Sequence, residues 1–179
     1  AAQPGSMQGD IGTMMHPDQV HIDADIAREM IFDQFPEYRH ERIAQLGVIG
    51  TVNAIFRVGS SVAARFPLRA MEPVECASML RNEAAAMTEF AAHSPFACPR
   101  PIGLGQPGPL YPLPWAMQSW IEGDVATHDG LSASTAFALD IAKLIASLRE
   151  ANTHGRRFDG QGRGGSLPDH DDWMSICFK

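Results

Sequence analysis

The chain has 179 residues, of which 45% are hydrophobic and 20% are charged, and this is the composition of a folded, soluble protein. Its 14 Lys and Arg residues against 21 Asp and Glu residues give a net charge of −7 at pH 7. That balance argues against nucleic-acid binding, because phosphate contacts need clustered positive side chains. An acidic surface attracts cations, so it suits a cationic small substrate, and it equally suits solubility alone.

The cysteines, histidines and apolar runs exclude further classes of protein. Cys76, Cys98 and Cys177 are odd in number and show no CxxC or Cys/His spacing, so neither a disulfide framework nor a zinc site is predicted, and a reducing cytoplasm is the expected location. The histidines do not recur at helical ligand spacing with a partner acid. No apolar run approaches the roughly 20 residues that span a bilayer. We expect residues 1–17 to be a tag remnant and a flexible leader.

The first predicted elements are a helix and three strands. The stretch "DADIAREMIFDQF" carries apolar residues on one helical face, with Asp23 as its N-cap and Pro36 marking its end. The runs "RIAQLG", "NAIFRVG" and "SVAARFP" are rich in β-branched or aromatic residues and are punctuated by glycines. This pattern predicts three antiparallel strands.

A long helix is predicted over residues 73–93. Met79, Glu83, Met87 and Phe90 recur close to one face of it, and a glutamate on such a face needs an explanation. Prolines and glycines then flank a predicted strand at "RPIGLG". The next stretch, "PWAMQSWIEG", predicts a mostly apolar strand that stops at Gly123, where a linker between two lobes is expected to begin.

Two more helices are predicted in the C-terminal third. The first covers residues 134–155, with a Ser or Thr cap in front, Gly155 closing it, and one apolar side formed by Phe137, Ile141, Leu144, Ile145 and Leu148. A polar, glycine-rich loop leads into the second, which is expected to begin near Leu167. The predicted fold class is therefore α+β.

In this order, the elements resemble the N-terminal lobe of a protein-kinase-like fold, and their details resemble the aminoglycoside phosphotransferase family, which includes macrolide kinases. The segment "VAAR", residues 62–65, is similar to the kinase "VAIK" strand, whose cation contacts the α- and β-phosphates of the nucleotide and pairs with a helix glutamate. Arg65 replaces the lysine, and its planar fork can hold phosphate bidentately. The resemblance gives Glu83 the role of orienting Arg65. Without this order of elements, a solvated glutamate and a strand-edge charge would be the preferred interpretation.

Two further segments resemble nucleotide-binding parts of the family. "GVIGTVN" stands where the phosphate-covering turn belongs, and Gly50 with Asn53 matches the family's GxxN pattern, although a plain hairpin turn would look the same. "WAMQSWIEGD" resembles the hinge between lobes, which makes Gln118 the gatekeeper. Ser119 would then offer its carbonyl and Ile121 its amide to a purine edge. A buried strand ending in a turn is the structural interpretation of the same segment, and both can hold.

The resemblance places Ala63, on the third strand, over the base. It covers only the first part of the family pattern. "GRGGSLPDHDDW" is similar to the segment that precedes the family's catalytic loop, whose own "HxDxxxxN" supplies a catalytic aspartate and a Mg²⁺-binding asparagine. The three HxD triplets, ending at Asp18, Asp23 and Asp172, all lack the asparagine five residues later. We therefore expect no catalytic or metal residue in this chain, and Mg²⁺ ligands beyond Lys179.

The resemblance implies a kinase that uses ATP or GTP with Mg²⁺ to phosphorylate a hydroxyl of an aminoglycoside- or macrolide-like molecule, with this chain inactive alone. It implies a nucleotide-binding lobe over residues 18–122 and the beginning of a helical C-terminal lobe over residues 123–179, whose remainder would be its partner. Neither a nucleic acid nor a membrane is an expected partner. The alternatives are a non-catalytic nucleotide-binding or scaffolding domain of the same fold, and an unrelated α+β interaction domain.

Overall fold

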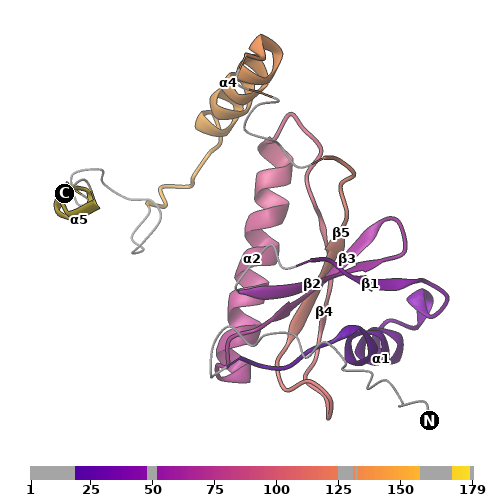
Figure 1. Ribbon diagram of the computed structural model, residues 1–179. Helices are drawn as coiled ribbons and strands as arrows, with labels where there is room; N and C mark the ends of the chain where they lie inside the picture. The colour runs from indigo at the N-terminus through magenta and orange to yellow at the C-terminus, as the bar shows by residue number, and fades with distance from the viewer. Residues whose placement is uncertain (1–18, 48–51, 125–130, 132, 158–170, 178–179) are drawn as a thin grey trace, which may run out of the picture.

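A five-stranded antiparallel sheet forms the centre of the structure, a computed structural model that describes residues 19–47, 52–124, 131, 133–157 and 171–177 (Figure 1). Its strands lie in the order β1-β2-β3-β5-β4, and every neighbouring pair is antiparallel. The strands are β1 (Ile43–Gln45), β2 (Asn53–Val58), β3 (Val62–Pro67), β4 (Pro101–Gly105) and β5 (Trp115–Ser119). The predicted α+β class and its five antiparallel strands are confirmed.

The β2–β3 hairpin sets which side chains share a face of the sheet. Its turn begins at Gly59, whose φ of +57° favours glycine, and an added Cβ there would lie 2.1 Å from Oε2 of Glu41. The resulting register pairs Ile55 with Arg65 and Arg57 with Ala63. Because directly opposed residues point to the same side of a sheet, these four side chains share one face.

The other face carries the hydrophobic core. Helix α1 (Ala24–Gln34) is capped by Asp23, whose Oδ1 accepts hydrogen bonds from two backbone amides of its first turn, as predicted for an N-cap. After α1 ends, Pro36 opens a short 3₁₀ helix, η1 (Pro36–Tyr38). The core is formed by α1 and by large side chains of the sheet and the β4–β5 connection, chiefly Met30, Ile31, Phe56, Phe66, Tyr111 and Trp115.

Aromatic contacts and one buried hydroxyl organise this core. The rings of Phe66 and Trp115 stack at 4.7 Å, and Tyr111 meets Phe66 edge-on at 5.1 Å. The Tyr111 hydroxyl donates a hydrogen bond to the carbonyl oxygen of Pro67, and burial raises the pKa of Tyr111. The connection between β4 and β5 is thereby fastened to the end of β3.

Helix α2 (Pro73–His93) runs alongside the sheet (Figure 1), and the side chains that it buries differ from the predicted apolar face. Its buried residues are Cys76 and Leu80, whereas Met79 is half-buried and Phe90 is 41% exposed. The predicted face is therefore wrong at its C-terminal end, because only the N-terminal half of the helix packs into the core. The thiol of Cys76 donates to the carbonyl oxygen of Pro114, and burial raises its pKa.

The C-terminal elements begin and end differently from the prediction. Strand β5 stops at Ser119 rather than Gly123. Helix α4 (Thr135–Arg149) is capped by Ser134, whose Oγ accepts from the Phe137 amide at 3.2 Å, but it ends at Arg149 rather than Gly155. The backbone turns left-handed at His154 and Gly155, well after the helix has ended.

The apolar side predicted for α4 is present in the sequence but is not buried among the described residues. Phe137, Ile141 and Ile145 are exposed, and Ser147 donates to the carbonyl oxygen of His93 at the end of α2. The last helix, α5 (Asp171–Cys177), matches the second predicted helix, whose expected start near Leu167 lies outside the described residues.

Candidate functional site

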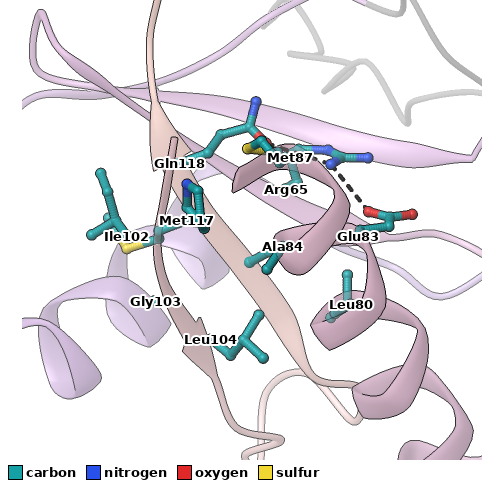
Figure 2. A pocket seen from close by; sticks show the side chains of 12 residues that line it. Arg65, Leu80, Glu83, Ala84, Met87, Ile102, Gly103, Leu104, Met117 and Gln118 are labelled. Atoms are coloured by element: carbon teal, nitrogen blue, oxygen red, sulfur yellow. Dashed lines mark hydrogen bonds and ion pairs between the residues drawn. The ribbon is translucent and has the colours of Figure 1, made fainter. Parts of the chain in front are cut away.

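The predicted ion pair between β3 and α2 is present in the structure. Arg65 Nη1 lies 3.2 Å from Glu83 Oε2, and Figure 2 shows the two side chains pointing toward each other. The same Nη1 lies 3.5 Å from Oε1 of Gln118 on β5. The Arg65 side chain is 22% exposed and that of Glu83 is 42% exposed. Strand β3, helix α2 and strand β5 thus meet at one guanidinium, and the prediction of this contact is confirmed.

Local sequence patterns explain why Arg65 and Glu83 meet. On β3, Ala64 and Phe66 turn into the core, so the alternation of a strand places Arg65 on the opposite face. On α2, Leu80 is buried one turn before Glu83, and residues three apart lie on the same side of a helix. The burial of Leu80 therefore holds the carboxylate of Glu83 toward the sheet.

A cavity of about 260 Å³ lies between α2, β4 and β5, next to the ion pair (Figure 2). Arg65, Glu83 and Gln118 form its polar part, and its remaining lining is mostly apolar: Leu80, Ala84, Met87, Pro101, Ile102, Gly103, Leu104, Ala116 and Met117. Met87, which belongs to the predicted apolar face of α2, lines this cavity instead of packing into the core. The sequence interpretation contained no signal for this space.

Two of the residues predicted to surround a base, Ala63 and Gln118, form a cross-strand pair next to the pair that contains Arg65. Ala63 on β3 is directly opposite Gln118 on β5, so both share the face of Arg65. Ala63 is only 1% exposed. A base placed over it would have to displace the groups that now bury it.

The predicted hinge segment follows the end of β5. Ser119 donates its amide to the carbonyl oxygen of Arg100 at 2.8 Å, and its Oγ accepts from the Arg100 amide at 2.9 Å. The Trp120 amide donates to the carbonyl oxygen of Ser61 at 2.7 Å, which extends the pairing with the hairpin by one residue. Ile121 is exposed just beyond this last hydrogen bond.

The predicted phosphate-covering turn is only partly described. Asn53 is the first residue of β2 and lies opposite Pro67. Its side chain therefore shares the sheet face of Arg65. Gly50 lies outside the described residues. Of the residues predicted to bind nucleotide, the structure thus brings Arg65, Glu83 and Gln118 into contact, with Ala63 opposite Gln118.

Sequence reasoning missed one charged residue on the same face. The Arg57 guanidinium lies 4.3 Å from the centre of the Trp120 ring, and its Nη2 donates to the carbonyl oxygen of Ser60 and to Oε1 of Glu122. The available signal was the alternation of β2, in which Arg57 stands between two core residues, Phe56 and Val58.

Other kinds of site are not found in the part of the chain that the structure describes. Within those residues, no group of three or more His, Cys, Asp or Glu side chains is placed to hold a metal ion. Among the described helices, none has the length and apolar character needed to cross a membrane.

Three solved structures with a similar fold are of aminoglycoside phosphotransferases. A GDP complex of wild-type aminoglycoside 2′-phosphotransferase-IIIa has a TM-score of 0.58 and 19% identity over 74% of this chain and 44% of that one. A GDP complex of a single-substitution mutant of that enzyme has a TM-score of 0.60 and 18% identity over 86% of this chain and 50% of that one. A GDP and kanamycin complex of APH(2″)-IIIa has a TM-score of 0.56 and 19% identity over 72% of this chain and 42% of that one.

These likenesses show a shared fold, and the chain spans about half the length of the structures it matches. No curated protein matches the sequence significantly. Residues 47–174 match the phosphotransferase enzyme family (APH), a range that includes the ion pair, the cavity and the segment after β5. The match covers well over half of the 179 residues, and the chain therefore belongs to the phosphotransferase enzyme family.

Proposed function

We propose that this chain is the nucleotide-binding part of a kinase that transfers the γ-phosphate of ATP or GTP to a hydroxyl of a small molecule. The observation that carries the proposal is the Arg65–Glu83 ion pair, formed between β3 and α2 on the face of the sheet opposite Ala64 and Phe66. Family membership and the GDP complexes of structures with the same fold support it.

In this proposal Arg65 holds the α- and β-phosphates. Among the described residues, both side-chain contacts of Arg65 use Nη1, so Nε and Nη2 are left to donate to phosphate oxygens. Glu83 fixes the plane of the guanidinium, because a planar fork binds phosphate well only in the right orientation. Asn53 and Gly50 would belong to the turn that covers the phosphates.

The base would be bound by the segment after β5. In the proposal, the Ser119 carbonyl accepts from the purine edge, the Ile121 amide donates to it, and Ala63 lies over the ring with Gln118 as gatekeeper. Two observations support this arrangement. Ala63 and Gln118 are directly opposed on the same sheet face as Arg65, and the backbone leaves the sheet immediately after Trp120.

Chemistry would need residues outside this chain. Because none of the three HxD triplets is followed by the asparagine of HxDxxxxN, we place the Mg²⁺ ligands and the catalytic aspartate beyond Lys179, in the remainder of a C-terminal lobe that begins with residues 123–179. Bound Mg²⁺ would neutralise charge on the transferred phosphoryl group. The chain alone should therefore bind nucleotide in its lobe of residues 18–122 and not turn it over.

For the acceptor we propose an aminoglycoside- or macrolide-like molecule, whose phosphorylation would confer antibiotic resistance. The kanamycin complex of a structure with the same fold and the net charge of −7, which favours a cationic substrate, support an aminoglycoside. The odd number of cysteines, without CxxC or Cys/His spacing, supports a cytoplasmic location, where nucleoside triphosphates are available.

Nucleotide-dependent stabilisation tests the proposal. At a hundredfold excess over its Kd, a ligand stabilises the folded state by about 2.7 kcal/mol, which is readily measured by thermal or urea unfolding. ADP and GDP should each be tested with the wild type, with Arg65→Met and with a matched control, Arg28→Met, which removes an arginine ion-paired to Asp25 on the exposed side of α1. Stabilisation lost only in Arg65→Met is the expected result. No stabilisation of the wild type would contradict nucleotide binding.

A turnover assay separates the kinase from its alternative, a non-catalytic nucleotide-binding or scaffolding domain. The chain and a longer form that includes the segment after Lys179 are assayed side by side with kanamycin and a macrolide. Phosphorylation by the longer form alone is expected. Turnover by the purified chain would contradict its proposed inactivity, and a longer form that binds nucleotide without turnover would favour the scaffolding alternative.

A further inference from the structure

Arg57 connects three separate parts of the structure. From β2, its Nη2 donates to the carbonyl oxygen of Ser60 in the hairpin turn and to the carboxylate of Glu122, and its guanidinium lies over the Trp120 ring at 4.3 Å. The Trp120 amide is itself bound to the carbonyl oxygen of Ser61. The residues on both sides of Ile121 are therefore fastened to the β2–β3 hairpin.

The position of Arg57 in the sheet links it to the proposed base site. Arg57, Ala63 and Gln118 lie directly opposite one another across β2, β3 and β5, so they form one row on one face. Arg65 belongs to the next row, with Ile55 and Ala116. Arg57 thus stands at the end of the row proposed for the base and one row away from the cation proposed for the phosphates.

The contacts of Arg57 differ from those of an ordinary surface ion pair. Its side chain is only 19% exposed, whereas that of Glu122 is 75% exposed. A carboxylate as exposed as Glu122 is well screened by water, so its ion pair alone contributes little. The stacking of a mostly buried guanidinium on an indole contributes more, since desolvation strengthens a cation–π interaction. The stacking on the Trp120 ring is therefore the main interaction that links Arg57 to the segment after β5, and the Glu122 carboxylate orients the guanidinium.

We infer that Arg57 is a positioning residue for nucleobase binding: by holding Trp120 and Glu122 it fixes the backbone of Ile121, whose amide would donate to the purine edge. This inference rests on the proposed function. Its physical basis is that, among the residues the structure describes, the backbone of Ile121 makes no hydrogen bond of its own beyond the last sheet hydrogen bond, which Trp120 makes. A segment held on both sides is ordered before the base arrives, so less conformational entropy is lost on binding.

The test compares a ligand that has a base with one that has none. Affinities of GDP, ADP and inorganic pyrophosphate are measured by calorimetry for the wild type, Arg57→Lys and Arg57→Met. Arg57→Lys keeps the positive charge but loses the planar stacking, so a general electrostatic effect on phosphates is held constant. We expect the tighter-binding nucleoside diphosphate to bind roughly tenfold more weakly to both variants, a change equivalent to about 1.4 kcal/mol. The affinity for pyrophosphate should stay unchanged in Arg57→Lys.

Controls make each outcome decisive. Arg28→Met should leave all three affinities unchanged, and Glu122→Gln should give a smaller, base-dependent loss even if the Arg57 variants fold poorly. Equal losses for nucleotide and pyrophosphate in Arg57→Lys, or an unchanged nucleotide affinity, would overturn the inference while leaving nucleotide binding intact. A wild type that binds neither GDP nor ADP would instead overturn the proposed function, and this inference with it.

Discussion

Replacing Glu83 by glutamine tests how much the central ion pair stabilises the fold. The substitution keeps the size of the side chain and an acceptor oxygen near Arg65 Nη1, but it removes the charge at 3.2 Å. Because Glu83 is 42% exposed, water screens the pair, and its contribution falls in the range of exposed pairs, about 0.5–1 kcal/mol. We therefore expect the free energy of unfolding without nucleotide to fall by no more than about 1 kcal/mol.

The assay is urea unfolding of the wild type, Glu83→Gln, Arg65→Met and the double variant. A coupling energy between the two sites of about 0.5–1 kcal/mol is expected, and it should shrink at high salt, since mobile ions screen exposed charges. Nucleotide affinity should fall more than stability does in Glu83→Gln, because the carboxylate's proposed task is to orient Arg65. Zero coupling, or a loss of stability above about 3 kcal/mol as for a buried pair, would refute the reasoning.

Three further outcomes follow from individual residues. Ala63→Phe should abolish nucleotide stabilisation in a thermal-shift assay, because its ring would occupy the place proposed for the base; stabilisation equal to wild type would place the base elsewhere. Gly59→Ala should lower the free energy of unfolding by about 1 kcal/mol, because φ is +57° and a Cβ would meet Glu41, and an unchanged urea midpoint would contradict this. The Ile26 amide, above all, lowers the pKa of Asp23 below its ordinary 3.8, so the cap's contribution is complete above that value and is lost as the pH falls through the lowered folded-state pKa. Asp23→Ala should cost about 1 kcal/mol at neutral pH in urea unfolding and should reduce the acid dependence of stability below pH 3.8; an unaltered acid profile would contradict the assignment.

The kinase-like site was accessible from sequence only through a family resemblance. Taken by itself, the charge on Arg65 fits a strand edge, and Glu83 fits a solvated helix face. The local sequence around either residue does not indicate the other as its partner, since the contact joins two separate elements of the chain. The order of elements and the "VAAR" segment supplied the pairing, and the ion pair at 3.2 Å confirmed the contact.

Features that depend on interactions between nearby residues, by contrast, can be predicted from the sequence. The N-cap at Asp23, the alternation of β2 and β3, and the cap of α4 at Ser134 depend on neighbours within a few residues, so the sequence alone determines them. Features that depend on where distant segments pack were decided by the tertiary structure. Phe90 is exposed because only the first half of α2 reaches the core, and the contact of Arg57 with Trp120 exists because the register of three strands brings them together. Periodicity assigns a side chain to a face, but only the packing of the whole chain determines what that face meets.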